Sequence, residues 1–128
     1  MRREADVARG WIRKAESDVV AMEATLKAGS LDAACFHAQQ SAEKYLKAYL
    51  ADNKIAFPPT HNLAKLVLLC RATDESFESL LSTVEPLTPY AVQLRYDGDF
   101  WPTIETAKHA RSCALEVKQF VLGRLPAR

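Results

Sequence analysis

The sequence predicts an all-α protein: an up-down helical bundle of four longer helices plus a short one, in a single domain spanning residues 1–128. Three observations support this prediction. Apolar residues recur at helical spacing over several long stretches. The chain has only 4 glycines, and its 6 prolines fall in a few short segments, so long stretches are uninterrupted. No stretch shows the strict alternation of apolar and polar residues that is typical of a β-strand.

The first helix is expected from about Asp6 to Lys27. Its apolar face collects Val7, Trp11, Ala15, Val19, Met22 and Leu26. Asp18 lies beside this face, and a partly buried carboxylate there needs a cationic partner or hydrogen-bond donors. Gly10, inside the helix, costs about 1 kcal/mol relative to alanine. Gly29 and Ser30 suit a C-cap and the next N-cap, and so short a link predicts an antiparallel hairpin.

The second helix, roughly Leu31 to Asn53, carries three kinds of residue on three faces. The predicted core face holds Cys35, Ala38, Ala42, Tyr45, Leu46 and Tyr49, and a second, narrower face aligns Phe36, Gln40, Glu43 and Lys47. The face with His37, Ser41, Lys44 and Asp52 is expected to meet solvent. Glu43 and Lys47 stand in the favourable i, i+4 order, so the narrow face is either a salt-bridged helix edge or the lining of a site.

Further helices follow a loop that holds Pro58 and Pro59, which cannot continue a helix. Thr60 is the expected N-cap of a third helix over about 62–72, and Thr73 or Asp74 caps another that continues to Val84. Prolines 86 and 89 should end that helix, before a short helical turn over 90–94. Thr103 is the expected N-cap of a last long helix to about Leu122.

Composition excludes several classes of function. The net charge is +1 with a pI near 7.7, so no global basic field attracts nucleic acid. Cys35, Cys70 and Cys113 are odd in number and far apart, which favours buried thiols over a disulfide framework. No apolar run is long enough to span a membrane, and the first residues are not a signal peptide. We therefore expect a cytoplasmic protein without membrane contact.

Four segments, taken in order, resemble the HEPN family (higher eukaryotes and prokaryotes nucleotide-binding domain). They are AESDV at 15–19, FHAQQSAEKYLKA at 36–48, THNL at 60–63 followed by Leu66, and LRYD at 94–97. The resemblance covers nearly the whole chain. It implies a helical bundle that forms a homodimer and often acts beside a minimal nucleotidyltransferase, frequently as one half of a toxin–antitoxin pair.

Many members of the family that this chain resembles are metal-independent endoribonucleases with an arginine followed, after four to six residues, by a histidine. The arginine holds the scissile phosphate and the histidine transfers protons. Counted from Arg95, the histidine should stand at position 100, 101 or 102, where this sequence has Phe100, Trp101 and Pro102. The sequence therefore favours the family's fold and disfavours its ribonuclease chemistry. Phe100 and Trp101 suit core or dimer anchors better than a platform for a base.

We interpret seven residues as ligand-binding: Asp18, Gln40, Glu43, Lys47, Arg95, Tyr96 and Asp97. Arg95 would bind phosphate, or alternatively pair with Asp18 or Glu43 and join the ends of the bundle. No catalytic residue, metal site or cofactor is assigned. The expected function is a non-catalytic module that binds a nucleotide, RNA or a nucleotidyltransferase. The alternatives are a ribonuclease toxin that uses Arg95 with His37, His61 or Tyr96, and a pure interaction scaffold.

Overall fold

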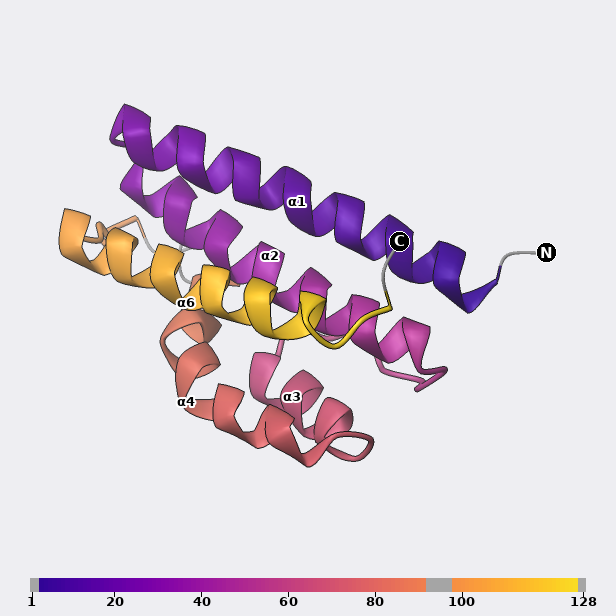
Figure 1. Ribbon diagram of the computed structural model, residues 1–128. Helices are drawn as coiled ribbons and strands as arrows, with labels where there is room; N and C mark the ends of the chain where they lie inside the picture. Colours follow the sequence, from indigo (N-terminus) through magenta and orange to yellow (C-terminus); the bar gives the residue numbers. More distant parts are fainter. Residues whose placement is uncertain (1–2, 92–97, 127–128) are drawn as a thin grey trace.

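Three long helices lie side by side and form the body of the protein (Figure 1). The computed structural model describes residues 3–91 and 98–126. The long helices are α1 (Glu4–Ala28), α2 (Leu31–Asp52) and α6 (Ile104–Leu122). Helix α2 is central, since it packs against α1, α6 and α3 (Leu63–Arg71), whereas α1 and α6 barely meet. The described residues contain helices and no strand, which confirms the all-α bundle.

The predicted hairpin between α1 and α2 is confirmed. Gly29 has φ 83°, the left-handed conformation that glycine adopts without steric cost. Its N–H donates to the carbonyl of Leu26, and the N–H of Ser30 donates to the carbonyl of Thr25 at 2.8 Å. These bonds satisfy the last carbonyls of α1 and turn the chain back on itself, so that α2 runs antiparallel to α1.

The segment between α3 and α6 differs from the single helix that the sequence predicts over 74–84. It consists of a 3-10 helix η1 (Glu75–Leu80), one turn of α-helix α4 (Leu81–Val84) and a second 3-10 helix η2 (Glu85–Ala91). Pro86 and Pro89 do not end the helical path as expected. Proline lacks the N–H of an α-helix, but its fixed φ near −65° fits the tighter 3-10 turn. The sequence also predicts a short helical turn over 90–94, and residues 92–94 of this turn lie outside the described residues.

The N-cap of α3 is Asn62, and the expected cap Thr60 is wrong by two residues. The side chain of Asn62 accepts a hydrogen bond from the N–H of Lys65 at 3.1 Å, which is the capping bond. Thr60 instead accepts from the N–H of Asn62 at 3.1 Å and tightens the loop before the helix. The predicted caps Asp74 and Thr103 are confirmed, since each side chain accepts from a backbone N–H of its helix.

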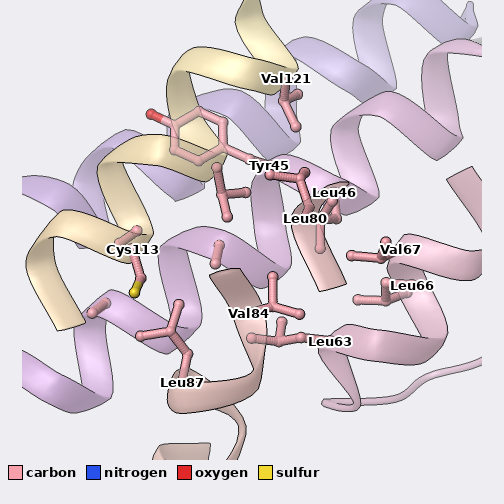
Figure 2. Packing of buried hydrophobic residues seen from close by; sticks show 14 of the residues in the cluster. Tyr45, Leu46, Leu63, Leu66, Val67, Leu80, Val84, Leu87, Cys113 and Val121 are labelled. Atoms are coloured by element: carbon pink, nitrogen blue, oxygen red, sulfur yellow. The ribbon is translucent and has the colours of Figure 1, made fainter. Parts of the chain in front are cut away.

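The core surrounds α2 and takes in buried residues of α1, α6 and the shorter helices; Figure 2 shows part of it. Figure 2 shows Leu63, Leu66 and Val67 of α3 facing Leu80 and Val84 across the cluster. All six residues of the predicted core face of α2 are buried, as are the three cysteine thiols. Each fully buried large aliphatic side chain contributes about 1.5–3 kcal/mol by leaving water. None of the described helices is both long and apolar enough to cross a membrane.

One face of α2 is not the solvent face that the sequence predicts. Ser41 is fully buried and donates to the carbonyl of Ala38 at 2.9 Å, while His37 and Lys44 are half-buried. The reason is that α1 packs along this face, so α2 is covered on most of its circumference. Phe100 packs against the core, but Trp101 is 72% exposed and is therefore no core anchor.

Candidate functional site

Five polar side chains form a connected group, here called the rim network, where α2 meets the loop before α3. Helix α2 contributes Gln39, Gln40, Glu43 and Lys47, and the loop contributes His61. Helical spacing aligns the α2 residues along one edge of the apolar face. Gln40, Glu43 and Lys47 are three of the predicted ligand-binding residues. The structure brings them together with Gln39, which was not predicted, and with His61, which the sequence offered only as an acid/base of the ribonuclease alternative.

The Glu43 carboxylate is the centre of the rim network. Lys47 Nζ donates to Glu43 Oε2 at 2.9 Å, and His61 Nδ1 lies 2.8 Å from Oε1. The side chains of Glu43 and Lys47 are only 4% and 8% exposed, so this ion pair is nearly removed from water. Such a pair needs further hydrogen bonds to offset the loss of hydration. Here the histidine supplies one of them.

Gln39 connects the loop to α2. Its Nε2 donates to Glu43 Oε1 at 3.2 Å and to the backbone carbonyl of His61 at 3.3 Å. Its Oε1 accepts from Gln40 Nε2 at 2.6 Å. Gln39 is fully buried, and sequence reasoning missed it because it follows the core residue Ala38 and carries no charge. Through these bonds, Gln39 fixes the position of His61 against the carboxylate.

Lys47 also contacts two aromatic rings. Its Nζ lies 5.4 Å from the ring centroid of Trp11 on α1 and 5.9 Å from that of Phe57 in the loop. The two rings meet edge to face with centroids 6.2 Å apart. Cation–π attraction of this kind strengthens when the ammonium group is desolvated. Trp11 and Phe57 therefore cover the Lys47 end of the rim network.

His61 is the solvent-facing member of the rim network, with 66% of its side chain exposed. An ionised carboxylate only accepts hydrogen bonds, so the bond to Glu43 places the proton of a neutral imidazole on Nδ1. Nε2 then remains the accepting nitrogen, and it has no partner among the residues that the structure describes. A histidine oriented by a carboxylate in this way is able to bind a ligand or transfer a proton.

Asp18 belongs to a neighbouring but separate cluster. Its carboxylate pairs with His37 Nδ1 at 2.9 Å and with Lys44 Nζ at 2.5 Å, both on α2. The cationic partner expected for this buried carboxylate is thus present. The cluster joins α1 to α2, and its bonds run to His37 and Lys44 rather than to Glu43 or Lys47, so Asp18 does not join the other predicted residues directly. Sequence reasoning missed His37 and Lys44 because it assigned them to solvent.

A hollow of about 680 Å³ opens on α1 beside the rim network. We call it the α1 hollow. Among the described residues it is lined by Val7, Gly10, Trp11, Arg13, Lys14 and Ser17. Trp11 is shared between the α1 hollow and the aromatic enclosure of Lys47. Three predicted site residues, Arg95, Tyr96 and Asp97, lie outside the described residues.

Titratable groups elsewhere do not assemble into a second centre. No three His, Cys, Asp or Glu side chains of residues 3–91 and 98–126 come close enough to hold a metal ion. Cys113 Sγ lies 3.6 Å from His109 Nε2, but burial raises the pKa of this thiol, which disfavours the nucleophilic thiolate. Burial also raises the pKa of Cys35 to about 11 and that of Cys70 to about 12.

These features define a small all-helical domain whose central helix carries a polar network beside a hollow. The HEPN domain family matches over residues 8–125, so the chain belongs to the HEPN family. No curated protein matches it.

Two solved structures share the fold. TT1696 from Thermus thermophilus is 27% identical, with a TM-score of 0.75 over 92% of this chain and 98% of that one. ST0689, described as an archaeal HEPN homologue, is 24% identical, with a TM-score of 0.76 over 97% of this chain and 98% of the other.

Proposed function

We propose that this chain is a non-catalytic HEPN module that binds a nucleotide or an RNA end, as a homodimer in the cytoplasm. In this proposal its partner is a minimal nucleotidyltransferase, and the two form a toxin–antitoxin-like system. Family membership supports the general class. The rim network supports a ligand-binding role for Gln40, Glu43 and Lys47, and Arg95, Tyr96 and Asp97 complete the proposed site. Asp18, which the sequence also assigned to it, belongs to the proposal only as a neighbour, because its carboxylate is bonded to His37 and Lys44.

The observation that carries the proposal is the nearly buried Glu43–Lys47 pair at the edge of an apolar face. A buried ion pair of this kind is often no more stabilising than apolar residues of the same size, and sometimes less so by about 1–4 kcal/mol. Stability alone therefore gives little reason for a carboxylate, an amine and a histidine here. Recognition of a polar ligand does give one, because His61 extends the network to solvent.

The non-catalytic part of the proposal rests on the sequence after Arg95. Phe100, Trp101 and Pro102 occupy the positions of the family's ribonuclease histidine, and none of them transfers a proton near neutral pH. An arginine without that histidine still binds a phosphate group through its planar fork of donors.

The proposal is tested by binding, in a variant that removes the charges and keeps the shape. Glu43→Gln combined with Lys47→Met replaces the ion pair by neutral groups of similar volume. Fluorescence anisotropy with a labelled single-stranded RNA and competition by AMP should show an affinity weaker by about tenfold or more. Arg71→Met, which removes an exposed ion pair with Glu78, is the matched control and should bind like the wild type. Unchanged binding in the double variant would favour the interaction scaffold instead.

A second candidate function is favoured by the Glu43–His61 pair. In an endoribonuclease that uses Arg95 to hold the phosphate, His61 Nε2 would be the proton-transferring group and Glu43 would orient the ring. This candidate predicts metal-independent cleavage of RNA that is lost in both Arg95→Ala and His61→Ala. Cleavage that survives His61→Ala would remove this histidine from the mechanism.

A further inference from the structure

Gly10 is unexplained by the fold around it. It lies inside the 25-residue helix α1, where glycine is less favourable than alanine because of its backbone freedom. A Cβ added at Gly10 would meet no atom within 4 Å, so no neighbouring element requires the missing side chain. Glycine is the usual residue where a ligand approaches the backbone closely. Gly10 lines the α1 hollow, and the absent side chain keeps that hollow open.

The other lining residues show which chemistry the hollow fits. Arg13 and Lys14 are exposed cations, and neither forms an ion pair within residues 3–91 and 98–126. Trp11 contributes a large planar ring, and no acidic side chain is among the described lining residues. The volume of about 680 Å³ falls within the size range of small-molecule sites. An occupant with a flat ring and a negative charge matches this set.

We propose that the α1 hollow binds one nucleotide unit, with its base stacked on Trp11 and its phosphate held by Arg13 and Lys14. This inference rests on the proposed function and names a subsite for it. Stacking of a base on an aromatic ring is tolerant of sequence, and two unpaired cations suit a phosphate. Because Lys47 contacts Trp11, a base in the hollow lies next to the rim network. The nucleotide is either free or one unit of an RNA strand.

The chain has 2 tryptophans, Trp11 and Trp101, which permits a site-specific fluorescence test. Trp101→Phe leaves Trp11 as the only reporter, and Trp11→Phe leaves Trp101. Each protein is titrated with AMP and, separately, with a single-stranded RNA oligonucleotide. The proposal predicts saturable quenching of Trp11, whether or not Trp101 also responds. Quenching by both ligands identifies a mononucleotide site, and quenching by RNA alone identifies a strand-binding site.

Filling the hollow gives the second measurement. Gly10→Leu should weaken binding by about tenfold or more, since its side chain would occupy the space of the base. Gly10→Ala, the milder variant, should raise the melting temperature and still weaken binding measurably. Ala24→Leu adds the same side chain at an exposed position of α1 outside the hollow and should bind like the wild type.

The possible results separate this inference from the proposed function. The nucleotide subsite would be overturned, and the proposed function left standing, by two results together: RNA binding, measured by anisotropy, that Gly10→Leu does not change, and no quenching of Trp11. Quenching of Trp101 in place of Trp11 would do the same. Absence of binding of AMP and RNA by the wild-type protein would overturn both. A Gly10→Leu protein that changes its oligomeric state and not its affinity would overturn the subsite and show that the hollow meets another chain.

Discussion

Removing Lys47 should destabilise the protein far more than removing an exposed cation. Lys47→Met keeps the length of the side chain but leaves the Glu43 carboxylate, 4% exposed, without its ammonium partner. Removal of one member of a buried ion pair costs about 3–5 kcal/mol. Because His61 and Gln39 still bond to this carboxylate, we expect the lower end, about 3 kcal/mol.

The double variant Glu43→Gln, Lys47→Met removes both charges together. It should be within about 1 kcal/mol of the wild type, since apolar or neutral replacement of a buried pair is often neutral. The coupling energy in the double-mutant cycle is then about 2 kcal/mol or more. The exposed pair of Arg71 and Glu78 supplies the control: Arg71→Met should cost less than about 1 kcal/mol.

The assay is urea unfolding followed by circular dichroism, at one fixed protein concentration and with equal slopes required across variants. Stability is taken from the midpoints of the transitions. If Lys47→Met lowers the free energy of unfolding by no more than Arg71→Met does, the reasoning is refuted, because the Glu43–Lys47 pair would then behave as a solvated surface contact.

Three further predictions concern the core and the contact between α1 and α6. Glu23 of α1 accepts a hydrogen bond from Arg111 of α6, and this bond lowers the pKa of the Glu23 carboxyl below its usual 4.5. The pair therefore stabilises the fold above pH 4.5, and this stabilisation is lost as the pH falls through the lowered pKa. Glu23→Gln, at a partly exposed site, should lower the free energy of unfolding by less than about 1 kcal/mol at pH 7. At pH 3 the difference in free energy of unfolding between this variant and the wild type should be smaller. A disulfide reagent at pH 8 should leave the Cys35 and Cys70 thiols unmodified until urea unfolds the chain, because burial raises their pKa to about 11 and about 12. Tyr45→Phe should keep or raise the melting temperature, since the buried Tyr45 hydroxyl has no hydrogen-bond partner within the described residues.

The helices were predictable from the sequence where local rules decide the structure. Periodicity located α1, α2 and α6 to within a few residues, and Gly29 with Ser30 predicted the hairpin. The predicted cap Thr60 was wrong because Thr60 and Asn62 are both good capping residues two positions apart, and only the loop geometry selects between them. The 3-10 path through Pro86 and Pro89 depends on packing against the core, which periodicity does not describe.

The candidate site was predictable only in part. Spacing on one helix aligned Gln40, Glu43 and Lys47, because helical geometry alone brings them together. Besides Lys47, Glu43 bonds to Gln39 and to His61, which lies 18 residues away in the loop before α3. The contact with His61 depends on how this loop packs against α2, and helical spacing does not predict that packing. The segment THNL at 60–63, already part of the family resemblance, was the available signal for His61. For His37 and Lys44 the available signals were the segment FHAQQSAEKYLKA at 36–48 and the expected cationic partner of Asp18, but only the position of α1 buries these two side chains.

The most direct test of the central claim is a metal-free incubation of end-labelled single-stranded RNA with the purified protein. The same samples are run on a native gel, which reports binding, and on a denaturing gel, which reports cleavage. A binding module without catalysis predicts a shifted complex whose RNA remains intact, and loss of the shift in the Glu43→Gln, Lys47→Met variant. Cleaved RNA whose production stops in His61→Ala would contradict this account and establish the Glu43–His61 pair as the proton-transferring centre of a ribonuclease.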